Sequence, residues 1–173
     1  LLDSTLRAAG GIPHYGVYRF LRGPYRLLQG DTSPAPPPVI LSYGMGVESS
    51  AILLRWLTDP SSRDFELEDL VVLTAQTGDE FKDLGPLLQT HILPLLRQHK
   101  VRWVQVARGG AFQESGIAVL EDSREPTRAY LEGAYRLTDE LLAAGTVPQA
   151  ASGQRKCSLK FKGWVLDSWV ERE

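Results

Sequence analysis

Three short apolar runs, separated by segments of helical character, constrain the fold of this chain more than any other feature. The runs cover residues 39–41, 70–74 and 101–106, and they are rich in β-branched residues, as buried strands are. Residues 51–57 follow the first run with a helix-like apolar pattern, and residues 82–99 follow the second with leucines at helical spacing. Alternating strands and helices predict an α/β fold, with a parallel sheet covered on both faces and ligands at the carboxyl ends of its strands.

The rest of the chain predicts two further helices. Pro86 and Pro94 indicate that the helix after the second run begins late and is kinked. Apolar residues at helical spacing predict an amphipathic helix over residues 127–144 that ends at Gly145. A last helix is expected from about Ser158 to the end of the chain.

Composition excludes several classes of protein. At 173 residues and 43% hydrophobic content, the chain is long enough for one globular domain with a substantial core. A formal net charge of −2 gives no global attraction to nucleic acid or to an anionic membrane. A single cysteine excludes a disulfide framework within this chain and suits a reducing cytoplasm, so we expect a cytoplasmic protein. No apolar run is long enough for a membrane span, and there is no signal-peptide pattern.

The sequence divides into three parts. Residues 1–33 interleave aromatic residues with arginines and predict an N-terminal arm or helical extension. Residues 34–38 form a proline-rich linker, and residues 39–173 are expected to form the main domain, with the alternating strands and helices. The arm has two interpretations: it docks nucleic acid or a protein partner through charge and stacking, or it is a short helix packed on the domain. Because the chain starts without methionine and stops inside a helical pattern, we expect it to be truncated at the C-terminus.

The turn after the first apolar run is typical of a phosphate site. Residues 39–50 read VILSYGMGVESS, so a strand enters a small-residue turn that opens directly into a helix. Glycine lets backbone N–H groups approach an anion, and a helix start leaves unpaired donors with a partial positive charge. The sequence therefore predicts phosphate binding here. The expected binding residues are Ser42, Tyr43, Gly44, Met45, Gly46, Val47, Ser49 and Ser50.

A purely structural interpretation of this turn stays open. The pattern lacks the GK[ST] ending of a Walker loop and the third glycine of a GxGxxG motif. A tight strand-to-helix turn, with Glu48 complementing the helix dipole, would give the same residues.

Acidic residues follow the second apolar run. Asp79 and Glu80 are expected at a strand's carboxyl end, where carboxylates hold Mg²⁺ or bind ribose hydroxyls. The alternative is a capping box at an ordinary helix start, because Thr77 precedes Glu80 by three residues.

A basic segment lies near the end of the chain. Residues 155–162 read RKCSLKFK and form an expected loop-to-helix junction whose cations would close over a polyphosphate or a sulfate. A thiol among cations is a candidate nucleophile, which points to Cys157. The alternative is a solvated basic face with Cys157 buried as a small apolar residue.

In this order, the three segments resemble the adenine nucleotide α-hydrolase-like superfamily, and within it the phosphoadenylyl sulfate (PAPS) reductases and PP-loop ATP pyrophosphatases. That family carries SGGxDS after its first strand, a DTGDEF-like segment after its second, and R-x-C-[ST]-x-x-x-K before a late helix. The counterparts here are residues 44–49, 76–81 and 155–162, and the resemblance spans residues 38–169. It implies a Rossmann-like three-layer sandwich with a mainly parallel five-stranded sheet.

The resemblance also implies roles for individual residues. The 42–50 loop would hold the pyrophosphate of ATP, or the sulfate and phosphate of a sulfonucleotide, and Mg²⁺ would accompany the nucleotide. No iron–sulfur cluster is expected within this chain. Glu48 and Asp79 would be the magnesium ligands. The implied catalytic residues are Glu48, Asp79, Glu80, Cys157 and Lys160, and the further nucleotide-binding residues are Thr74, Gln76, Thr77, Gly78, Arg155 and Lys162.

The chain departs from the family pattern at several positions. Gly44 and Met45 replace Ser-Gly, which removes a hydroxyl and a flexible backbone position. Glu48 is one methylene longer than the usual Asp, and Gln76 replaces the first Asp of the DTGDE segment. The reductases' C-terminal catalytic cysteine motif is not found.

Three functions follow as expectations. The first is an AMP-forming ATP pyrophosphatase that activates an acceptor, either a small molecule or a nucleobase in tRNA or DNA, for sulfur or nitrogen transfer. The second is a sulfonucleotide reductase, and the third is a non-catalytic nucleotide-binding or scaffold subunit whose arm docks a protein partner. We expect a homo-oligomer or a component of a complex.

Overall fold

The structure of the protein, a computed structural model, describes residues 39–147 and 158–173 and the backbone of residues 17–19. Five strands are hydrogen bonded in their sequence order. They are β1 (Val17–Arg19), β2 (Val39–Ser42), β3 (Leu70–Gln76), β4 (Arg102–Arg108) and β5 (Ile117–Ser123).

The three predicted apolar runs form the parallel centre of the sheet. β2 pairs with β3 and β3 with β4 in parallel, whereas β1 joins β2 and β5 joins β4 in antiparallel pairs. The expected α/β class and the parallel pairing of these runs are confirmed. Because β2, β3 and β4 point the same way, the loops after them meet at one edge of the sheet.

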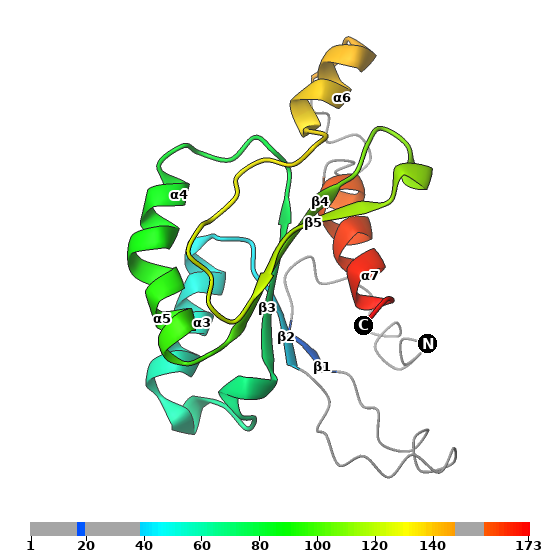
Figure 1. Ribbon diagram of the computed structural model, residues 1–173. Helices are drawn as coiled ribbons and strands as arrows, with labels where there is room; N and C mark the ends of the chain where they lie inside the picture. The colour runs from blue at the N-terminus through cyan, green and yellow to red at the C-terminus, as the bar shows by residue number, and fades with distance from the viewer. Residues whose placement is uncertain (1–16, 20–38, 148–157) are drawn as a thin grey trace, which may run out of the picture.

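Helices cover both faces of the sheet (Figure 1). On one face lie α3 (Val47–Thr58), α4 (Leu84–Leu87), a π-helical turn (Leu88–Ile92) and α5 (Leu93–Gln98). On the other face lies α7 (Trp164–Val170), which follows the π-helical turn η6 (Ser158–Gly163). The short helix α6 (Leu137–Ala144) projects beyond the carboxyl end of β3.

Alternation along the strands creates two apolar cores. In β3, Leu70 and Val72 pack with α3 and α5, while Val71 and Leu73 pack with Val165 and the rest of α7. This two-residue period is the strand geometry that a sheet buried on both faces requires.

The helical segment after β3 is broken, as its prolines predict. The π-helical turn lies between α4, which contains Pro86, and α5, which has Pro94 in its first turn. Proline removes a backbone donor and clashes with the preceding turn, so a single regular helix cannot span this segment.

The predicted helix over residues 127–144 is wrong in its first half. Only α6 is helical, and it ends at Gly145 in the left-handed conformation, as expected. Residues 124–136 instead form an irregular segment with bends near both ends, which we call the strap. The Gln105 side chain donates to the Tyr130 carbonyl at 2.9 Å and accepts from the Tyr130 N–H at 2.8 Å. This pair of bonds replaces the hydrogen bonding that a helix would have supplied.

Two further elements differ from expectation. Strand β5 was not predicted, although residues 117–120 form a short apolar run; the strand ends in polar residues and lies at a half-exposed edge. Three residues of the predicted arm, Val17–Arg19, form a strand of the sheet rather than a helix. The remainder of the arm and the predicted linker lie outside the described residues.

Candidate functional site

The loop between β2 and α3 is fastened to the neighbouring strand. The Tyr43 N–H donates to the Leu73 carbonyl at 2.8 Å, and the Thr74 hydroxyl donates to the Tyr43 carbonyl. Met45 then adopts φ 59°, the left-handed region that favours glycine. Met45 therefore adopts a backbone conformation that glycine reaches more easily than a residue with a side chain.

The amino end of α3 is open. Its N-cap residue, Gly46, has extended backbone angles and no side chain that caps the helix. The first helical hydrogen bond runs from the Ser50 N–H to the Gly46 carbonyl at 3.0 Å, so the amides of Val47, Glu48 and Ser49 have no carbonyl partner within the helix. Gly46, Val47 and Glu48 are exposed. These amide donors lie at the carboxyl end of β2, where an anion can reach them.

The hydroxyl groups of the loop point inward. Ser49 Oγ donates to the Gly46 carbonyl at 3.2 Å, and Ser50 Oγ lies 2.9 Å from the Tyr43 hydroxyl. Burial raises the pKa of Tyr43, and the hydrogen bond with Ser50 partly offsets that rise. Ser42 is also buried. The predicted hydroxyl donors at Ser49 and Ser50 are thus engaged within the protein, and an anion would meet backbone donors instead.

The side chain of Gln76, at the end of β3, contacts the loop between β2 and α3. Its side chain is 0% exposed, and its Nε2 donates to the sulfur of Met45 at 3.6 Å. Its Oε1 is buried without a hydrogen-bond partner. An unsatisfied buried carbonyl oxygen costs about 1–3 kcal/mol, so this atom stands out among the buried polar atoms of the described residues.

Glu48 places a negative charge beside the same amides. A methyl group on Gly46 would lie 3.5 Å from Glu48 Oε2. The carboxylate complements the helix dipole, as the structural interpretation of the turn expects, but it would repel an anion that arrives without a cation.

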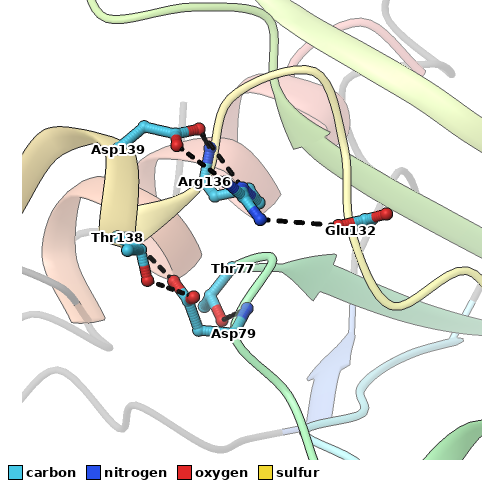
Figure 2. A network of polar contacts seen from close by, with 6 residues as sticks. All are labelled: Thr77, Asp79, Glu132, Arg136, Thr138 and Asp139. Atoms are coloured by element: carbon cyan, nitrogen blue, oxygen red, sulfur yellow. Dashed lines mark hydrogen bonds and ion pairs between the residues drawn. The ribbon is translucent and has the colours of Figure 1, made fainter. Parts of the chain in front are cut away.

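Asp79 is directed at α6 rather than at the loop. Its carboxylate accepts hydrogen bonds from the Thr138 N–H at 2.8 Å and from the Thr138 hydroxyl, at the amino end of α6 (Figure 2). The Leu137 N–H also donates to the Thr77 carbonyl at 2.9 Å. The Thr77 hydroxyl donates to Glu80 Oε1 at 3.0 Å, but no helix begins here, because α4 starts only at Leu84.

Arg136 packs over the same turn. Its guanidinium pairs with Asp139 at 3.0 Å and lies 3.9 Å from Glu132 (Figure 2). The hydrogen bond from Arg136 holds the pKa of Asp139 below its ordinary value. Gly78, with φ 84°, lies against this side chain: a Cβ on Gly78 would come within 2.4 Å of Arg136 Cγ. Together these contacts fix α6 to the end of β3.

The basic segment is only partly described. Arg155 and Cys157 lie outside the described residues. Lys160 Nζ forms an ion pair with Glu140 Oε1 of α6 at 2.6 Å, and Lys162 is half-buried. The basic turn is therefore connected through α6 to the segment that carries Asp79.

Arg108, Arg136 and Thr138 were not among the site residues predicted from the sequence. Arg136 and Thr138 fell within the predicted amphipathic helix, where they read as ordinary solvent-exposed positions. Arg108 had a usable signal: it is a cation at the end of an apolar strand, two residues after the predicted run.

Within residues 39–147 and 158–173, no cluster of three His, Cys, Asp or Glu side chains is arranged to hold a metal ion. None of the helices in these ranges is long and apolar enough to cross a membrane. Comparison of the chain with protein-family models, curated proteins and solved structures finds no match.

Proposed function

We propose that the protein binds the phosphate chain of an adenine nucleotide at the amino end of α3 and transfers AMP from ATP to an acceptor oxygen. The observation that carries the proposal is the uncapped, exposed start of α3. The preceding loop contacts Gln76 of β3 through Met45, and Gln76 Oε1 has no hydrogen-bond partner among the described residues. Amide donors suit phosphate oxygens, and a carbonyl acceptor suits an N–H group such as the adenine amino group. The resemblance of residues 44–49 and 76–81 to PP-loop motifs supports the same ligand.

In the proposed reaction, the acceptor oxygen forms a bond to the α-phosphorus and loses its proton to solvent. The bond from the α-phosphorus to the bridging oxygen breaks, and pyrophosphate leaves. Negative charge grows on the leaving group, so the amides of Val47, Glu48 and Ser49 stabilise it most in the transition state. In this proposal the ammonium group of Lys160 leaves its ion pair with Glu140 and contacts a phosphate oxygen instead, which adds a cation at the same edge of the sheet.

Magnesium fits this arrangement as a partner of the nucleotide. Mg²⁺ commonly binds through one or two carboxylates together with substrate phosphates, and Glu48 is the carboxylate next to the proposed phosphate position. The ion would neutralise charge between this carboxylate and the phosphates. The proposal therefore expects nucleotide binding to require Mg²⁺.

A second candidate is nucleotide binding without turnover. It is favoured by Asp79, whose carboxylate is engaged by Thr138 and so is turned away from the proposed nucleotide.

The test is incubation of purified protein with ATP, Mg²⁺ and candidate acceptors, followed by separation of the nucleotide products. AMP with pyrophosphate supports adenylyl transfer, whereas ADP rejects it. Saturable ATP binding with no product favours the second candidate. Tight binding of adenylyl or phosphoadenylyl sulfate with negligible ATP binding would instead indicate a sulfonucleotide reductase.

A further inference from the structure

Arg108 is a buried arginine that forms no ion pair within residues 39–147 and 158–173. It is the last residue of β4 and is 1% exposed. Its Nε donates to the Gly110 carbonyl at 3.1 Å, its Nη2 to the Ala111 carbonyl at 2.8 Å and its Nη1 to the Lys160 carbonyl at 3.4 Å. All three partners are neutral backbone groups, and no carboxylate of the described residues forms an ion pair with this guanidinium.

Aromatic rings enclose the same group. The guanidinium carbon lies 5.1 Å from the ring centroid of Trp164, 5.3 Å from that of Phe161 and 6.0 Å from that of Tyr135. Tyr135 and Phe161 also stack on each other, with centroids 5.9 Å apart. Arg108 therefore connects three segments: the loop after β4, the strap and the basic turn η6.

Arg102 provides an internal comparison. It lies on the same face of β4, at the opposite end, and its guanidinium also lies over a tryptophan, Trp169, at 5.3 Å. Arg102, however, is neutralised by Asp122 and Glu173, each at 2.7 Å. The burial of Arg108 is therefore compensated by carbonyl groups of separate segments and by aromatic rings rather than by carboxylates.

We propose that Arg108 is a positioning residue that fixes Lys160 at the carboxyl edge of the sheet. Its planar guanidinium bonds carbonyls of two separate segments at once, which a single ammonium group on lysine cannot reproduce. The backbone of Lys160 is held by Arg108 and its side chain by Glu140 of α6, and α6 is held in turn by Asp79 after β3. This inference rests on the proposed function, in which Lys160 contacts the phosphates.

The experiment compares Arg108→Lys with Arg102→Lys as the matched control and measures dissociation constants for MgATP and for adenosine by calorimetry. Adenosine has no phosphate for Lys160 to contact. We expect Arg108→Lys to weaken MgATP binding about tenfold or more and adenosine binding less than about twofold, since small misplacements of a binding group have effects of this size. Arg102→Lys should change neither constant beyond about twofold, because it lies far from the phosphates.

A double-mutant cycle tests whether the effect passes through Lys160. In a Lys160→Ala background, Arg108→Lys should cause no further loss of MgATP affinity; independent, additive losses would overturn the inference. Equal losses for MgATP and adenosine, or no loss, would also overturn it. If the wild-type protein binds neither ligand, the proposed function itself fails, which is a distinct result.

Phe161→Leu is a second variant that tests the same proposal if Arg108→Lys does not fold. This substitution removes the ring beside the guanidinium but keeps an apolar side chain in the core. The same selective loss of MgATP affinity supports the positioning role, and unchanged or equally reduced affinities for the two ligands contradict it.

Discussion

The side-chain amide of Gln76, at the end of β3, donates a hydrogen bond to the sulfur of Met45, in the loop that follows β2, over 3.6 Å. Met45 is held there in a left-handed conformation that costs roughly 1–2 kcal/mol for a residue with a side chain. The contact joins two neighbouring strand ends beneath the amino end of α3. The other polar atom of this side chain, Gln76 Oε1, is buried and has no hydrogen-bond partner among the described residues.

Gly46→Asn should separate stability from ligand binding. Gly46 already has the extended backbone of an N-cap, and an asparagine there would accept a hydrogen bond from the first helical amides. We expect the free energy of unfolding to stay equal or rise by a few tenths of a kcal/mol. The thermal shift caused by MgATP should disappear, because the new side chain occupies the proposed phosphate donors. Val47→Ala, which changes an exposed side chain but keeps its amide, is the control; an undiminished MgATP shift in Gly46→Asn would count against the site.

Gln76→Met should remove an unsatisfied acceptor without leaving a cavity. Because Oε1 has no partner, we expect the free energy of unfolding to be unchanged or to rise by up to about 1 kcal/mol, while MgATP affinity falls. Denaturant unfolding and calorimetry measure the two effects.

Gln105→Met is the matched control for this substitution. Gln105 is equally buried on the neighbouring strand, but both of its polar atoms bond Tyr130. Its replacement leaves two backbone groups of the strap unpaired and should destabilise by about 1–3 kcal/mol. Equal destabilisation by the two substitutions would show that Gln76 Oε1 is satisfied in solution.

Gly78→Ala should loosen α6. The added Cβ would clash with Arg136 and would also strain a backbone with φ 84°. Gly145→Ala is the control, because Gly145 has φ 60° but no atom within 4 Å of the added Cβ. We expect about 1–2 kcal/mol of backbone strain in both variants, and a further cost from the clash with Arg136 only in Gly78→Ala. Faster hydrogen exchange at the Thr138 amide should appear only in Gly78→Ala, and equal exchange in the two variants would contradict the packing of Arg136 on this turn.

Asp167 should make stability depend on pH. Burial raises the pKa of its carboxyl above the ordinary value of 3.8, and repulsion from Glu171 adds to the rise. The folded state therefore holds this proton more tightly than the unfolded state, and stability falls as the pH rises from about 4 through the raised pKa. Asp167→Asn should raise the melting temperature relative to wild type near about pH 7 and leave it unchanged near about pH 3. A gain of the same size at both pH values would indicate a packing effect instead.

The sheet could be predicted from the sequence because its central strands are continuous apolar runs. Residues 70–74 are buried on both faces, and such a run has few alternatives to a central parallel strand. The strap could not be predicted in this way. Leu131, Tyr135 and the leucines of α6 lie at helical spacing and favour a helix there. Gln105, a side chain remote in sequence, instead pairs with the backbone of Tyr130 and ties the strap to β4. Local periodicity contains no information about that long-range pair.

The candidate site, like the fold, could be predicted from the sequence only in part. The loop after β2 and its contact with β3 follow from two parallel strands that end together, so the association of Met45 with Gln76 was accessible from the pattern. The orientation of Asp79 was not, because it depends on where α6 begins, and Thr138 was expected in the middle of a longer helix. The ion pair between Lys160 and Glu140 was not predicted for the same reason, since the position of Glu140 also depends on where α6 begins.

The most direct test of the account follows the backbone amide signals of isotope-labelled protein by nuclear magnetic resonance during titration with MgATP. The account predicts saturable shifts at Val47, Glu48 and Ser49, with no change at the buried Leu96 of α5 and none of these shifts in Gly46→Asn. Amides of α3 that stay unmoved while MgATP saturates the protein would contradict it.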